Sequence, residues 1–143
     1  MKCYKFCSDK TNLTKKNQLD AGLDIKANDN FVVPARGSKV ITTGLKVAIP
    51  NGHVGLIWSR SGMSVNNKIE VGAGCIDSNY RGELLVHLYN FSDQDYEIWA
   101  GNKIAQFLTV PICLNHYEEV DEFGWKKLEN TERGQNGFGS SGV

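Results

Sequence analysis

The sequence predicts an all-β fold, a sandwich or barrel of short strands with a single short helix. Glycine accounts for 15 of the 143 residues, about 10% where soluble proteins average ~7%. The glycines separate short runs rich in Val, Ile, Leu and aromatic residues, at intervals of about 8–12 residues, as in sandwiches and barrels. No long segment repeats its apolar residues with the period of a helix.

The short apolar runs are predicted as strands. In the run 83–91, apolar residues occupy both alternating faces, so we expect a largely buried strand. The predicted helix covers residues 61–67, with Ser61 as its N-cap. The Gly/Ser-rich end predicts a flexible tail over residues 133–143, after a barrel domain of residues 1–132. The predicted strands are residues 39–49, 53–58, 68–71, 83–91, 96–99 and 103–112.

Length and charge limit the classes of function. A chain of 143 residues is long enough for one domain with a real core. Sixteen basic and sixteen acidic residues cancel, with no basic stripe, so we expect no nucleic-acid partner. No apolar run approaches a membrane span, and the N-terminus lacks an apolar signal region. We therefore expect no membrane partner and an intracellular protein, in the cytoplasm or, for a viral protein, in the host cell.

The four cysteines indicate no metal or disulfide framework. Cys3 and Cys7 lack a second close pair, and the histidines are scattered, so no zinc pattern is matched. We expect buried or edge thiols at Cys75 and Cys113 as well.

The segment 74–83, GCIDSNYRGE, concentrates the groups that carry chemistry. Gly74 and Gly82 permit a tight turn, so we interpret the segment as a hairpin with Asp77 and Tyr80 at its tip. A carboxylate and an aromatic ring on a stiff turn suit a small-molecule pocket. Read alone, the segment fits a plain turn capped by Asp77 equally well.

Other segments offer groups for phosphate and for a planar ring. Arg60 and Ser61 open the predicted helix, and Gln106 is a polar group inside an apolar strand, where an unpaired amide would cost roughly 1–3 kcal/mol. In the tail, Arg133 offers a fork for phosphate and Phe138 offers a flat face. The alternative for Arg60 is a solvated side chain beside a capped turn, and the alternative for the tail is a disordered terminus. Together the segments predict a phosphate-bearing planar ligand, with any metal held mostly by phosphate and water.

Five segments resemble, in order, the motifs of the trimeric dUTPases, and they span nearly the whole chain. One such motif is weak, whereas five in order at fitting spacing are specific. Three departures keep size or charge or are nearly neutral: Cys75 replaces an aliphatic residue, Ser64 stands where Ala is common, and Lys103 stands where Arg is common. Two others carry a consequence: Val71 stands where some members have Asn, which leaves base recognition to the main chain, and Gln135 and Asn136 make the tail less rich in glycine, which would slow or stiffen its closure. The five segments are AGLDI (21–25), RSG (60–62), GCIDSNYRGE (74–83), GNKIAQF (101–107) and RGQNGFGSSG (133–142).

The resemblance implies a jelly-roll-like β-barrel that forms a homotrimer with shared active sites, each closed by a C-terminal tail. It implies hydrolysis of dUTP to dUMP and pyrophosphate, assisted by Mg²⁺, which limits uracil incorporation into DNA and supplies dUMP.

The resemblance also implies roles for individual residues. Asp77 would activate the attacking water, Tyr80 would exclude a 2′-hydroxyl, and Asp24 would reach Mg²⁺ through water. The phosphate chain would lie against residues 60–62 and Gln106. The full set of substrate-binding residues is Arg60, Ser61, Gly62, Gly74, Cys75, Ile76, Asp77, Ser78, Asn79, Tyr80, Gln106, Arg133, Phe138, Gly139 and Ser140.

Two rival functions use the same pocket. The dCTP deaminases share the fold but place a catalytic glutamate in the strand after the hairpin, where this chain has His87. A non-catalytic nucleotide sensor is the other rival, and Asp77, Arg60 and Arg133 argue against it.

Overall fold

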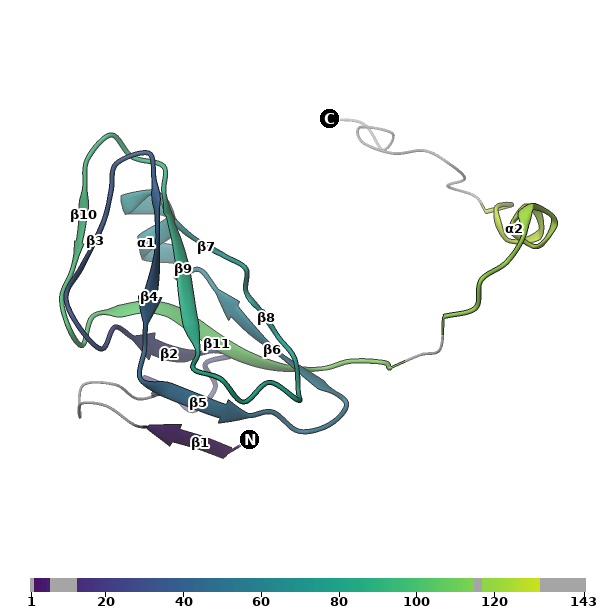
Figure 1. The fold of residues 1–143 in the computed structure, drawn as a ribbon, viewed down its shortest axis with the longest axis horizontal. Coiled ribbons are helices and arrows are strands. Elements are labelled where there is room, and N and C mark those ends of the chain that lie inside the picture. Colours follow the sequence, from purple (N-terminus) through teal and green to yellow (C-terminus); the bar gives the residue numbers. More distant parts are fainter. Residues whose placement is uncertain (1, 6–12, 115–116, 132–143) are drawn as a thin grey trace. The chain divides into compact units, whose positions relative to one another are not determined.

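The computed structural model of the chain describes residues 2–5, 13–114 and 117–131. The chain divides into two compact units, Met1–Cys113 and Leu114–Val143. The first unit contains the strands and the first helix, in the order β1 (Lys2–Lys5), β2 (Leu23–Lys26), β3 (Phe31–Val33), β4 (Ser38–Thr42), β5 (Leu45–Ala48), β6 (His53–Trp58), α1 (Ser61–Asn67), β7 (Ile69–Gly72), β8 (Cys75–Ile76), β9 (Leu85–Asn90), β10 (Tyr96–Ile98) and β11 (Lys103–Pro111) (Figure 1). The second unit contains α2 (Glu122–Leu128).

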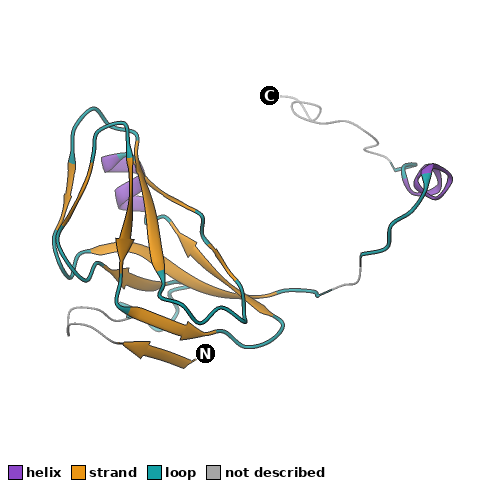
Figure 2. Cartoon of the chain, in the orientation of Figure 1, coloured by secondary structure: helices purple, strands orange, loops and turns teal. Residues whose placement is uncertain are grey.

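All strand pairs of the first unit are antiparallel, and they form four short sheets. The largest sheet has the order β2-β11-β6-β8, and a second has the order β4-β9-β7. The pairs β1-β5 and β10-β3 complete the unit, and α1 contacts β7 (Figure 2). This architecture confirms the predicted all-β fold.

One continuous core lies between the sheets. Val86 and Leu88 of β9 are fully buried, but their neighbours Leu85 and Tyr89 are 43% and 39% exposed. The prediction of a strand buried on both faces is therefore wrong within one chain, because only one face of β9 turns toward the core. The other large core residues include Ile25, Ile41, Leu45, Ile57, Ile69, Leu84, Ile98, Ile104 and Phe107.

The predicted strand 39–49 is two strands, β4 and β5. Gly44 interrupts it with a φ of 68°, a left-handed conformation that favours glycine. The carboxylate of Glu83 accepts hydrogen bonds from the backbone N–H groups of Thr43 and Gly44, at 2.9 and 2.8 Å. These bonds satisfy the donors that leave the ladder at the break.

Helix α1 confirms the predicted range 61–67, but its N-cap differs from the prediction. Arg60 occupies the N-cap in an extended conformation, without a side-chain capping bond, and Ser61 is the first helical residue. The helix ends at Lys68, whose φ of 58° is left-handed.

Helix α2 was not expected, so residues 13–114 and 117–131 contain two short helices where one was predicted. Asp121 caps it by accepting a hydrogen bond from the backbone of Gly124 at 2.8 Å. An i,i+4 ion pair joins Lys126 to Glu122 at 2.9 Å. The capping aspartate and the i,i+4 pair are local features of the sequence, and they would have allowed this helix to be predicted.

Two cysteines lie within the described side chains, Cys75 and Cys113, and both are free and exposed. Cys75 lies in β8, the edge strand of its sheet, as expected of an edge thiol. Among the residues that the structure describes, no helix is long and apolar enough to cross a membrane.

Candidate active site

Three charged side chains meet where β2, β11 and the end of β6 come together. The carboxylate of Asp24 accepts from Lys103 Nζ at 2.7 Å and from Arg60 Nε at 3.2 Å. The side chain of Asp24 is only 16% exposed, whereas those of Arg60 and Lys103 are 35% and 39% exposed. The two cations are therefore held by one acid and still reach solvent, as an anion site requires.

Gln106 belongs to the same cluster. The strand registers place it beside Asp24 on one side and Trp58 on the other. Its amide Nε2 donates to the carbonyl oxygen of Ser59 at 2.9 Å, which provides the partner expected for a polar group in this strand. Gly22 lies against its side chain, since a Cβ atom at Gly22 would lie 2.6 Å from Gln106 Oε1.

Ser61 and Gly62 begin α1 and are exposed beside this cluster. An open hollow of about 540 Å³ adjoins them, lined by Arg60, Gly62 and Lys103 together with residues of α1 and the loop before β11. Asp24, Arg60, Ser61, Gly62 and Gln106, all predicted from separate motifs, thus surround one region. Lys103 joins them although it was not among the predicted site residues.

The segment 74–83 is not the hairpin that we expected. Its first strand, β8, pairs with β6, whereas the strand that follows, β9, pairs with β4 and β7. The chain therefore changes sheet twice: from β7 to β8 at Ala73, which has a left-handed φ of 50°, and back from β8 to β9 over residues 77–84. A single turn remains within the segment, where the Tyr80 backbone N–H donates to the Asp77 carbonyl oxygen at 3.1 Å.

The chemistry-bearing side chains of this segment are placed by that turn. Asp77 and Asn79 are exposed, and Ser78 is half-buried. The Tyr80 hydroxyl donates to the Glu83 carbonyl oxygen at 2.9 Å, and its ring lies against Gly82. Tyr80 is therefore fixed from both sides while 40% of it faces solvent.

A hollow of about 380 Å³ lies between β6 and the β7–β8 crossing. The residues that line it are Leu56, Ile57, Trp58, Ser59, Glu70, Val71, Gly74 and Cys75. Gly74 lies at the edge of this hollow and is joined to β6, because its carbonyl oxygen accepts from the Ile57 backbone N–H at 2.7 Å.

Gly74→Ala should destabilise the fold by about 2 kcal/mol, since overpacking against a backbone atom cannot be relieved by a rotamer change. A Cβ atom at Gly74 would overlap the carbonyl oxygen of Ile57. The check is urea unfolding, with Gly62→Ala as the matched control because a Cβ atom there meets nothing within 4 Å. Equal midpoints for the two variants would contradict the proposed close approach.

The structure separates Asp77 from Arg60 within one chain. Gly55 pairs with Ile76, which places Asp77 opposite Val54 at the start of β6. Arg60 follows the other end of the same strand, six residues beyond Val54, and an extended chain covers that span with a separation of roughly 20 Å. The proposed base and the phosphate cluster therefore lie at opposite ends of β6.

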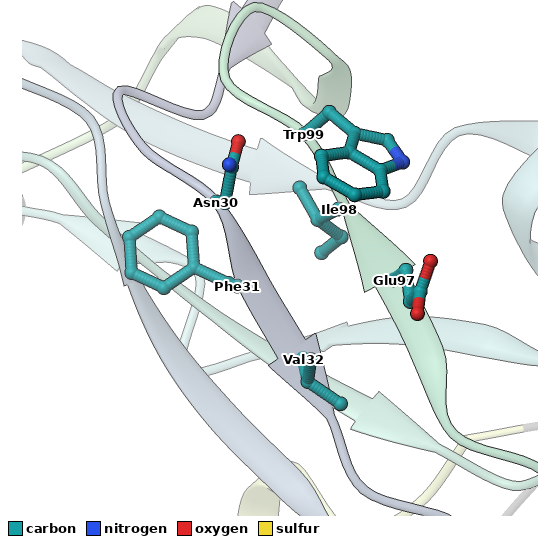
Figure 3. Close-up of a pocket in the computed structure, with 6 residues that line it drawn as sticks. All are labelled: Asn30, Phe31, Val32, Glu97, Ile98 and Trp99. Atoms are coloured by element: carbon teal, nitrogen blue, oxygen red, sulfur yellow. The ribbon is translucent and has the colours of Figure 1, made fainter.

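The remaining predicted residues Arg133, Phe138, Gly139 and Ser140 lie outside the described residues. A further hollow of about 160 Å³ lies on the β3–β10 ribbon, where Trp99 lies over Ile98 (Figure 3). None of the predicted site residues lines it.

The described residues could contact a magnesium ion only through water molecules bound to it. They contain no group of three or more His, Cys, Asp and Glu side chains that could hold a metal. Both oxygens of Asp24 already accept from cations, and each carboxylate oxygen keeps a second lone pair that can accept from a metal-bound water. A metal held mostly by phosphate and water stays a prediction.

Comparison with known proteins identifies the chain. The family model for dUTPase matches residues 8–142. The deoxyuridine 5'-triphosphate nucleotidohydrolase of Candida albicans is 40% identical over 90% of this chain and 79% of that protein. The chain belongs to the dUTPase family. It is thereby placed among the enzymes that hydrolyse dUTP, and the rival assignment to dCTP deaminases is set aside.

Solved dUTPases have the same fold. A variant of the Staphylococcus bacteriophage 80alpha dUTPase with dUpNHpp superimposes with a TM-score of 0.86 at 30% identity, covering 99% of both chains. A variant of the dUTPase from phage phi11 of S. aureus superimposes with a TM-score of 0.77 at 28% identity, over 86% of this chain and 99% of that one, and that protein coordinates a structural Mg(II) ion. His87, where the deaminases carry a catalytic acid, is half-buried on β9 with its ring centroid 4.4 Å from that of Tyr89.

Proposed function

We propose that this dUTPase hydrolyses dUTP to dUMP and pyrophosphate at a site shared between copies of the chain, with Asp77 as the base. An exposed carboxylate on a fixed turn can accept a proton from water, and general-base catalysis contributes typically 10²–10⁴-fold to a rate. Phosphoryl transfer needs little else beyond positioning and charge neutralisation. Asp77 would supply the base. Arg60 and Lys103, which are both paired with Asp24, would neutralise the charge of the phosphates.

The observation that carries the shared site is the separation of Asp77 from Arg60. A span of roughly 20 Å along β6 is too long for one chain to place its own carboxylate beside the α-phosphorus and its own arginine on the same phosphate chain. A site that takes Asp77 from one copy and Arg60 from another can bring both groups to one phosphate chain. A homotrimer with three equivalent sites has the closed symmetry that such head-to-tail sharing needs.

The phosphate chain is assigned to Arg60, Ser61, Gly62 and Gln106. The guanidinium of Arg60 is oriented by Asp24 at Nε and by the Lys103 carbonyl oxygen, which accepts from Nη1 at 3.3 Å, and its other N–H groups would bind phosphate oxygens. Bound Mg²⁺ would supply neutralisation of the phosphate charge. Asp24 would hold that ion through water.

The base and sugar are assigned to residues 74–80. The main chain of Gly74, Cys75 and Ile76 offers donors and acceptors to a uracil edge beside the hollow at β6. Ser78 and Asn79 complete the turn, and the ring of Tyr80 faces the deoxyribose. The tail residues Arg133, Gly139 and Ser140 would close on the γ-phosphate, with Phe138 stacked on uracil.

Tyr80→Ala should narrow the preference for dUTP over UTP by at least tenfold in kcat/KM, because the ring that excludes a 2′-hydroxyl is removed. Tyr80→Phe is the matched control: it keeps the ring and loses only the hydrogen bond to Glu83. Steady-state kinetics on both nucleotides measure the ratio. An unchanged ratio in Tyr80→Ala would contradict the assigned role.

The experiment that tests the function is pyrophosphate release from dUTP, UTP, dCTP and dTTP, with Mg²⁺ and with EDTA. We expect rapid release from dUTP, little from the other three, and a lower rate in EDTA. Release of ammonia from dCTP would support a deaminase. Tight binding of dUTP without turnover would support a nucleotide sensor.

A further inference from the structure

The segment Arg60–Gly62 lies between two serines that are bonded to one carboxylate. Ser59 Oγ donates to Glu70 Oε2 at 2.5 Å, and Ser64 Oγ donates to Glu70 Oε1. Ser59 ends the extended stretch before the segment, and Ser64 lies in the first turns of α1 after it. Glu70 thus joins the two flanks of the phosphate-binding residues.

The support for Glu70 is rigid. Its strand β7 pairs with β9, where Glu70 lies opposite Tyr89, and the preceding residue Ile69 is buried in the core. The Ser59 hydroxyl also accepts from the Val71 backbone N–H at 2.8 Å, so it bridges β6 to β7 with both its donor and an acceptor in use. A carboxylate fixed in this way can hold other groups in place.

The bond from Ser64 to this carboxylate contributes to the orientation of helix α1. Its N-cap makes no side-chain capping bond, and the one buried residue of the helix is Met63. An apolar contact is not directional, whereas two hydrogen bonds to one carboxylate fix a geometry. The same link reaches Gln106, because the carbonyl oxygen that its amide contacts belongs to Ser59.

We propose that Glu70 is a positioning residue for the phosphate chain of the nucleotide: through Ser59 and Ser64 it holds Arg60, Ser61, Gly62 and Gln106 in binding geometry. The proposal rests on the proposed function, which places the phosphates at these residues. Glu70 also lines the hollow beside Gly74 and Cys75, but both of its carboxylate oxygens accept from the two serines, so its assigned role is exerted through them. The two serine bonds hold the pKa of Glu70 below its ordinary value, so the carboxylate is charged and accepts from both hydroxyls at neutral pH.

The test compares the triphosphate with the nucleoside. In Glu70→Ala, we expect KM for dUTP and Kd for the non-hydrolysable analogue dUpNHpp to rise about tenfold, from the loss of hydrogen bonds to a charged group. Kd for deoxyuridine, which has no phosphate, should change less than about twofold because its contacts lie on residues 74–80. Glu70→Gln, which keeps one acceptor oxygen, should recover part of the loss.

Ser64→Ala keeps the test informative if Glu70→Ala folds poorly, since it removes only one hydroxyl. It should show the same selective loss, about threefold, and the loss should not add to that of Glu70→Ala in the double variant. Thr42→Val is the matched control: it deletes a half-buried hydroxyl bond to Asn28 of 2.7 Å in β4, and we expect wild-type KM.

Equal weakening of deoxyuridine and dUpNHpp would overturn the positioning role and would indicate a general effect on the fold. Wild-type KM in both Glu70→Ala and Ser64→Ala would overturn it as well, while dUTP hydrolysis by the wild type would leave the proposed function standing. Absence of dUTP hydrolysis by the wild type would overturn both.

Discussion

Asp77→Asn is expected to lower kcat for dUTP by about 10²–10⁴-fold, the range that a positioned general base contributes. The amide has the shape of the carboxylate but cannot accept a proton from water. Asp77 is exposed, and the bond that holds its turn uses its backbone carbonyl oxygen, so the substitution should leave the fold intact. Steady-state kinetics measure kcat, and Kd for dUpNHpp should remain within about threefold of the wild type.

Asp29→Asn is the matched control for this variant. Asp29 is also an exposed acid in a turn, and it accepts one bond from the neighbouring Asn30 backbone N–H at 2.7 Å. Its kcat should equal that of the wild type. Retained turnover in Asp77→Asn would remove the carboxylate from the mechanism.

Removing residues 133–143 is expected to lower kcat/KM for dUTP by about 100-fold, because the proposed phosphate contacts of Arg133 and the proposed stacking of Phe138 on uracil would be lost. The melting temperature should change by less than about 2 °C, since the core of the first unit is made by residues before Cys113.

Arg133→Ala in the full-length chain separates phosphate binding from ring stacking. It should raise KM for dUTP by about tenfold with little change in Kd for deoxyuridine. A large drop in melting temperature on truncation would contradict the prediction, because it would make the tail a stabilising element of the fold.

The sequence predicted the longer strands well and the short ones poorly. β6, β9 and β11, with six, six and nine residues, lie within predicted runs, because apolar residues over several positions mark a strand. β10, with three residues, is an exception among the short strands, since it also lies within a predicted run. β2, β3 and β8 have two to four residues, too few for such a pattern to emerge. They form because neighbouring strands supply partners, which is a tertiary effect.

The motifs suggested the site residues and part of their arrangement. Asp24, Arg60 and Gln106 come together as the motifs suggested. Lys103, which pairs with Asp24, was missed because its partner depends on the register between β11 and β2. The hydrogen bonds of Glu70 with Ser59 and Ser64 were also missed. The signal in the sequence was an acid in a short predicted strand that closely follows two serines.

The separation of Asp77 from Arg60 could not be predicted either. It follows from the pairing of β8 with β6, and the sequence favoured a pairing of the flanks of 74–83 with each other. The segment therefore keeps its proposed chemistry while changing its structural role, from a hairpin to a crossing between two sheets.

The shared site is tested most directly by mixing two inactive variants, Asp77→Asn and Arg60→Ala. Equal amounts are unfolded together and refolded, and dUTP hydrolysis is measured against each variant refolded alone. If each site takes Asp77 from one copy and Arg60 from the next, random trimers regain about a quarter of the wild-type activity, because each mixed trimer contains one intact site. If both residues of a site come from the same chain, no mixture has an intact site, and activity that stays at the level of the separate variants would contradict the account.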